Sequence, residues 1–322
     1  MKETTTHSAV PPGLGGTVLR TLPAIAVAVG LLTTVGWHVA EPVDPDWAVT
    51  LTQSGRGILA VGPSLLVLTV VVAAVGTALS GRHVPLGGVF AAAIGLAMLS
   101  LRGGSMQVVL AYCGSPQAST RRSLMLSMAI ECVLWAALLA VSWIVVESVW
   151  RWLWASGAEG TGETRAPKID KSARNPSPDK SKPSTGWPAL AVTTVIALFV
   201  IWMTIARTPV ATIARGQVIA SVAGGLYLGV LAARYFTGIN NTRWYVLAVP
   251  VVALVGYLLG FLQADLSWAK GALAPYARLA TTPSHALARP LPIEYIAVGV
   301  AGAIAGLWSG EKIEHVTKQE TS

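Results

Sequence analysis

The sequence predicts an all-α, polytopic transmembrane helix bundle with about eight spans in two four-helix halves. Of its 322 residues, 53% are hydrophobic and only 12% are charged, whereas soluble domains carry about 25% charged residues. The mean hydropathy is +0.60. Long apolar runs recur along the whole chain, separated by short polar segments. A chain with half the usual charge and this hydropathy is expected to have the lipid bilayer as its main solvent.

The spans follow from length, because about 20 apolar residues cross a hydrocarbon core about 30 Å thick. The third and eighth runs are shorter and richer in Gly and Ala, so a count of seven or nine is the alternative. The first run is expected to be a retained anchor, since His38 stands where signal-peptide cleavage requires a small residue. The predicted spans are 21–40, 57–79, 84–101, 123–146, 187–206, 217–233, 244–262 and 293–308.

A polar linker divides the chain. Residues 155–186 are rich in Lys, Arg, Pro and Ser and contain no aromatic residue, so they cannot bury enough surface to offset the entropy of ordering. We therefore expect a disordered basic linker between an N-terminal membrane half, 1–154, and a C-terminal membrane half, 187–310. A polar tail, 311–322, follows the second half.

Membrane orientation is predicted from the basic residues. With a cytoplasmic N-terminus, the inner segments contain 14 Lys and Arg and the outer segments contain 9. Cytoplasmic segments carry the excess of these residues, so both termini and the linker are expected to be cytoplasmic. Without the linker the numbers are 7 and 9, so this orientation depends mainly on the linker.

The formal net charge of +8 does not indicate nucleic-acid binding. Outside the linker, Lys and Arg stand singly or in pairs at the ends of apolar runs, where they meet lipid headgroups. The expected partners are the lipid bilayer and, in addition, other membrane proteins or a second copy of the chain.

Small residues recur at four-residue spacing in the last three predicted spans. Residues four apart share one helix face, and small side chains there let two helix backbones approach closely. We expect these faces to pack inside the bundle; a gating or oligomer interface is the alternative. The glycines concerned are Gly225 and Gly229, with Gly216 and Gly224 beside them, then Gly256 and Gly260, and finally Gly302, Gly306 and Gly310.

Glu131 is the acidic residue that lies deepest in a predicted span, about 13 Å from Arg122 along a helix. Ser127 and Trp135 share its helix face. An ionisable group in the membrane is a candidate functional residue by default. Either a protonated Glu131 bonds to a neighbouring backbone or Ser group and holds the bundle together, or it handles a proton or cation in a polar cavity. Both interpretations require Glu131 to face protein or water.

A polar insert at 102–117 contains a short apolar stretch between glycines. We expect a surface loop with an interfacial helix; a re-entrant, substrate-facing loop is the alternative, because irregular backbone in the membrane must be covered by protein or water.

No signature of a hydrolase, metalloprotease or nucleotide-binding enzyme is present, so we expect neither enzymatic activity nor a cofactor. One remote alternative is an outer-face thiol enzyme with Cys113 as nucleophile and His285 as base, assisted by Arg121 or Arg207. Cys113 and Cys132 are expected about 15 Å apart in depth, too far for a disulfide.

Two function classes remain. The sparse intramembrane charge favours a structural or assembly subunit of a membrane complex, because many transporters place several ionisable groups at the midplane. The alternative is a transporter or channel for a small solute or ion, with Glu131 in a polar cavity.

Overall fold

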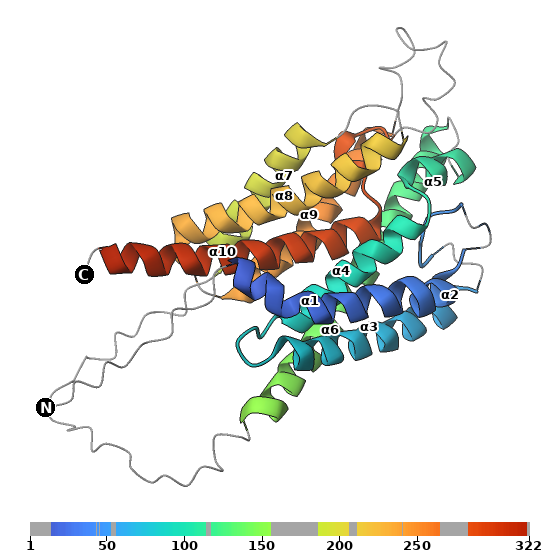
Figure 1. Cartoon of the computed structure of the whole chain (residues 1–322). Coiled ribbons are helices and arrows are strands. Elements are labelled where there is room, and N and C mark those ends of the chain that lie inside the picture. The colour runs from blue at the N-terminus through green and yellow to red at the C-terminus, as the bar shows by residue number, and fades with distance from the viewer. Residues whose placement is uncertain are drawn as a thin grey trace, which may run out of the picture.

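The computed structural model is helical throughout the part of the chain that it describes, without a strand (Figure 1). The described residues are 14–42, 44, 46–52, 56–113, 117–155, 186–205, 211–239, 241–264 and 283–320. The α-helices are α1 (Leu14–Leu31), α2 (Trp37–Ala40), α3 (Ile58–Ser80), α4 (Gly87–Arg102), α5 (Met106–Cys113), α6 (Ala118–Ala155), α7 (Trp187–Thr204), α8 (Ala211–Thr237), α9 (Thr242–Leu262) and α10 (Gly299–Glu320). Two π-helical segments, η1 (Leu32–Gly36) and η6 (Glu294–Val298), and a 3-10 turn, η5 (Ala286–Ala288), complete the fold.

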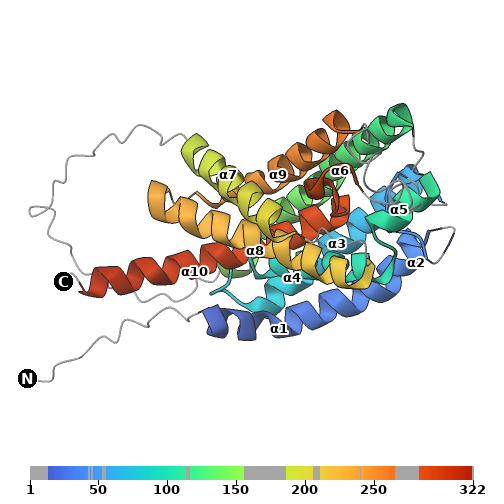
Figure 2. The same cartoon turned by 90° about the horizontal axis from the view of Figure 1, so that it is seen from above.

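The long helices run roughly along one axis and give the bundle two ends (Figures 1 and 2). One end, called the tail end below, is where α1 begins and α10 finishes. The other, called the α5 end, carries α2 and α5. The helix α1 continues through η1 into α2, and η6 continues into α10.

The helices pack in two groups. In the first, α3 and α4 contact each other and each of them also contacts α1 and α6. In the second, α8 contacts both α7 and α10, and α9 contacts the same two helices. The two groups meet mainly where α6 packs against α9 and where η6 packs against α4. A predominantly apolar core runs through both groups without a break.

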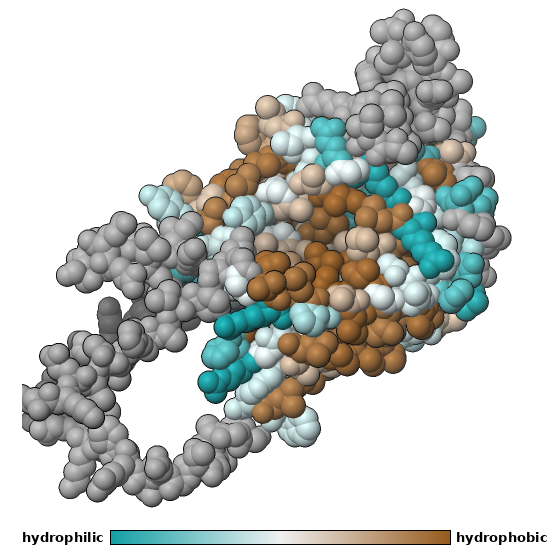
Figure 3. Space-filling model, in the orientation of Figure 1, coloured by the Kyte–Doolittle hydropathy of each residue, from teal (hydrophilic) through white to brown (hydrophobic). Residues whose placement is uncertain are grey.

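The outer surface is that of a membrane protein. Within the described part of the chain, six helices are long and apolar enough to cross a bilayer, and α4 is a shorter apolar helix. Large apolar side chains are exposed on the outside, for example Leu59 at 89%, Val195 at 64% and Phe199 at 60%. Figure 3 shows hydrophobic residues gathered over the middle of one flank, with hydrophilic residues toward the ends. The chain is therefore a multi-pass integral membrane protein; the count of eight spans stays a prediction.

The helices differ in length from the predicted spans. The longest, α6, extends from Ala118 to Ala155, beyond both ends of the predicted span 123–146. The last helix continues to Glu320 rather than ending at residue 308, because Glu, Lys and Gln in this stretch are good helix formers. Of the predicted linker, residues 156–185 lie outside the described residues.

The glycines of α10 lie against α8. A Cβ added to Gly306 would stand 2.7 Å from the Tyr227 carbonyl oxygen, and one added to Gly302 would overlap the backbone of Ala223. A Cβ at Gly310 would come within 2.7 Å of Arg234 Cδ. Gly302 and Gly306 let the two helix backbones touch, as small residues do in membrane bundles, and Gly310 leaves room for the Arg234 side chain.

The other predicted glycine pairs also face protein. A Cβ at Gly229 would lie 2.8 Å from the Thr193 carbonyl oxygen of α7, and Gly225 faces the same helix. Gly256 and Gly260 of α9 lie against the segment around η5. By contrast, a Cβ at Gly216 or Gly224 would meet no atom within 4 Å.

Candidate functional site

Two segments that lie between the long helices, the second of which includes the 3-10 turn η5, enter the bundle at the α5 end. We call residues 46–52 and 283–292 the first and second inserted segments. Their apolar side chains are buried. Val49 and Leu51 of the first segment are at most 3% exposed, and Ala288 and Leu291 of the second are fully buried. Non-helical backbone inside a membrane bundle must find hydrogen-bond partners in the protein itself. The buried polar side chains of the bundle supply many of them.

Glu131 of α6 holds the first inserted segment. Its Oε1 accepts a hydrogen bond from the Leu51 backbone N–H at 2.8 Å and another from Trp135 Nε1–H at 3.1 Å, and its Oε2 accepts from the Thr52 hydroxyl at 2.8 Å. Trp135 stands one helical turn from Glu131, so its indole reaches the same carboxyl group. The side chains of Glu131 and Trp135 are almost completely buried. Ser127 is not one of these three donors.

The second inserted segment is bound along its length by hydroxyl groups. Tyr257 of α9 donates to the Pro290 carbonyl at 2.5 Å, and Tyr295 of η6 donates to the Leu287 carbonyl at 2.6 Å. Ser284 donates to the Gly260 carbonyl at 2.9 Å. The His285 Nδ1 accepts the Leu287 backbone N–H at 3.2 Å and caps the 3-10 turn.

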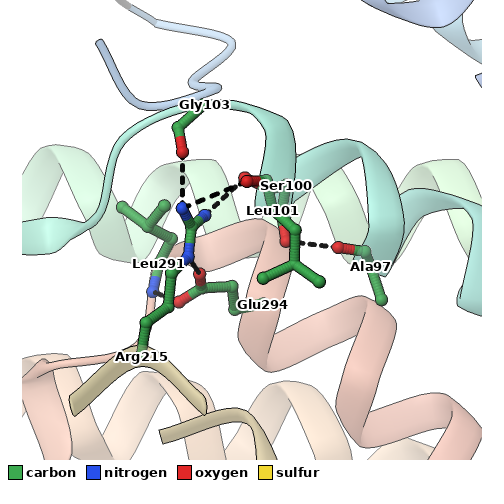
Figure 4. A network of polar contacts seen from close by, with 7 residues as sticks. All are labelled: Ala97, Ser100, Leu101, Gly103, Arg215, Leu291 and Glu294. Carbon is green, nitrogen blue, oxygen red and sulfur yellow. Dashed lines mark hydrogen bonds and ion pairs between the residues drawn. The ribbon is translucent and has the colours of Figure 1, made fainter. Parts of the chain in front are cut away.

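Glu294 closes this second segment and also binds Arg215 (Figure 4). Its Oε2 accepts the Leu291 backbone N–H at 2.9 Å, and its Oε1 accepts from Arg215 Nε–H at 3.0 Å. Glu294 is 2% exposed and the Arg215 side chain 15%. Glu131 and Glu294 therefore have the same structural role, because each accepts a hydrogen bond from a backbone N–H of an inserted segment.

Arg215 of α8 also binds the first helix group, through the end of α4. Its two terminal nitrogens donate to the Ser100, Leu101 and Gly103 carbonyls at the end of α4 (Figure 4). The last carbonyls of a helix have no partner within the helix and carry partial negative charge, so a guanidinium stabilises them. One side chain thus connects α8 and η6 to the C-terminus of α4.

The polar insert 102–117 links these elements. The Gly104 N–H donates to the Trp47 carbonyl at 2.9 Å, and a Cβ at Gly103 would stand 2.8 Å from the same oxygen. The insert then forms α5, whose Met106 is 2% exposed and whose Leu110 is fully buried. The insert 102–117 therefore packs against the first inserted segment and forms the short helix α5. The segments that enter the bundle without α-helix are the two inserted segments, 46–52 and 283–292.

A small pocket of about 30 Å³ lies beside the ion pair. Arg215, Glu294, Arg289, Ser105 and Gln107 contribute its polar lining. A cavity needs roughly 10–15 Å³ to admit one water, so this pocket has room for water and not for a larger solute.

Sequence reasoning missed Arg215 and Glu294. The predicted spans place both at the membrane edge, Glu294 as the second residue of span 293–308 and Arg215 as a loop residue before span 217–233. An acidic residue inside the start of an apolar run was the available signal. The proposed thiol arrangement stays a prediction, since the side chain of Cys113 and all of Arg207 lie outside the described residues.

No protein-family model, curated protein or solved structure gives a significant match to this chain. The fold and its surface define the class, a multi-pass integral membrane protein, and any particular function has to be argued from the site.

Proposed function

We propose that the protein is a structural or assembly subunit of a membrane complex. The observation that carries the proposal is the use made of Glu131 and Glu294. Each carboxylate accepts hydrogen bonds from the bundle itself at both oxygens. Groups used in this way stabilise a fixed shape.

Arg215 supports the same function. A guanidinium has five N–H donors in a rigid fork, and Arg215 directs them to Glu294 and to three carbonyls of α4. This arrangement fastens the two helix groups together at the α5 end. A rigid bundle with an apolar flank suits a protein whose task is to present a surface to neighbouring membrane proteins.

Affinity purification in mild detergent tests the proposal. The full chain, tagged at its C-terminus, should recover a membrane protein in fixed stoichiometry, and the tagged partner should recover this chain in return. Glu131→Gln, which preserves the shape of the side chain, should leave that recovery unchanged.

The contrary outcome is equally specific. If the purified chain is free of stoichiometric partners and catalyses proton-coupled flux in liposomes, and if Glu131→Gln abolishes that flux while the protein stays folded, the protein is a transporter.

A further inference from the structure

An apolar groove of about 690 Å³ lies between the two helix groups. One wall is α6, which contributes Ala137 and Ala140, and the other is α9, which contributes Pro250 and Val251. Val89 of α4 is part of its lining. Alanine at these α6 positions leaves space that a leucine side chain would fill.

Among the described residues that line this groove, the charged ones stand at one end. Glu147 and Arg243, which also line it, form an ion pair of 3.4 Å. Arg151, one turn beyond Glu147, pairs with the same carboxylate. The two arginine side chains are 72% and 66% exposed. The groove mouth therefore carries two exposed guanidinium groups against one carboxylate, a net positive charge.

The length and the charge distribution of the groove indicate its occupant. Val133 and Glu147 line it 14 positions apart on α6, or about 21 Å along the helix. Its walls are apolar along this length, and the charged side chains among its lining residues lie at one end. This is the arrangement that a phospholipid needs, because its acyl chain is apolar and its headgroup is charged.

From these observations we propose that the groove binds one acyl chain of an anionic phospholipid, whose phosphate lies against Arg243 and Arg151. The occupant comes from the bilayer leaflet at the tail end, where α9 begins. An apolar tail and a negatively charged head match the apolar walls and the positive mouth. This site is independent of the partner complex proposed above.

Native mass spectrometry of the full chain in mild detergent tests the site, with phosphatidylglycerol and phosphatidylcholine of identical chains as probes. One phosphatidylglycerol should be retained per protein. A net positive charge at the headgroup level should favour it over phosphatidylcholine about fivefold. Arg243→Gln should remove this preference, and Arg82→Gln, an exposed arginine outside the groove, should keep it.

Filling the groove tests the acyl chain. Ala140→Trp should lower lipid retention about tenfold or more, because several methylene groups lose their place. Val141→Trp, at the same depth on an outward-facing position that is 40% exposed, should leave retention unchanged. Val251→Trp fills the groove from the opposite wall and repeats the test if Ala140→Trp does not fold.

Three outcomes would overturn the proposal. Equal losses in Val141→Trp and Ala140→Trp would mean that the bound lipid is general boundary lipid. An unchanged headgroup preference in Arg243→Gln would remove the phosphate site. A photocrosslinker at position 137 that captures a protein instead of phosphatidylglycerol would assign the groove to a partner helix.

Discussion

Arg215 should be one of the most costly side chains to remove at the α5 end. Arg215→Met leaves Glu294 buried without its counter-charge and leaves three α4 carbonyls without their donor. Removing one partner of a buried ion pair costs about 3–5 kcal/mol. Because Arg215 keeps 15% exposure, we expect the lower end, about 3 kcal/mol, in the free energy of unfolding.

A double-mutant cycle isolates the pair. Glu294→Gln retains an acceptor for Leu291 and should cost less than Arg215→Met, and the double variant should cost less than the two single variants together by about 1 kcal/mol or more. The free energy of unfolding would be measured by sodium dodecyl sulfate titration, with Arg82→Met as an exposed control within about 0.5 kcal/mol of wild type. Additive costs, or an Arg215→Met variant as stable as the control, would show that the network does not join the helix groups.

Three further predictions concern other parts of the chain. Gly306→Leu should destabilise the protein by about 1–3 kcal/mol through overpacking against α8. Gly224→Leu should not, because a Cβ at Gly224 meets no atom within 4 Å; equal thermal stability of the two variants would contradict the packing. Burial lowers the pKa of His285, so the folded protein favours the neutral imidazole. The contribution of His285 to the free energy of unfolding is therefore full above the ordinary pKa of about 6.5 and is lost as the pH falls below that value. The free energy of unfolding measured against pH should fall in this range. His285→Asn keeps a hydrogen-bond acceptor but does not titrate in this range, so it should remove the fall. An impermeant thiol reagent in intact cells should not label cysteines placed at Ser177 and Ser322, and labelling of either would reverse the predicted orientation.

Composition and apolar run length were enough to predict the helical membrane fold, because both report the solvent directly. They could not predict the inserted segments. Residues 46–52 and 283–292 look like ordinary loops in the sequence. The first segment is held by hydrogen bonds to Glu131, which lies 79 or 80 residues further along the chain. The second is held by a hydrogen bond to Glu294, in the helix that follows it. The local pattern of apolar and polar residues does not predict contacts between segments that are distant in the sequence.

Glu131 shows the same limit at a single residue. Its position in an apolar run predicted an inward-facing carboxyl group, and the nearby Trp135 shares its face as expected. The donors from Leu51 and Thr52 could not be predicted, because they come from a loop of the first membrane half that returns into the bundle. Arg215 and Glu294 could not be predicted as a buried pair, because charged residues at the ends of apolar runs ordinarily lie at the membrane edge.

The most direct test of a structural role for the buried carboxylates is the free energy of unfolding of Glu131→Ala compared with Glu131→Gln. Alanine removes the oxygen that accepts from the Leu51 N–H and the Trp135 N–H, and each lost buried hydrogen bond costs about 1–3 kcal/mol. Glutamine keeps one oxygen for both donors, and the Thr52 hydroxyl can turn to accept from its amide. The structure predicts a loss of about 2–6 kcal/mol for alanine and less than half of that loss for glutamine. Two variants that both unfold like wild type would contradict the structural role of Glu131.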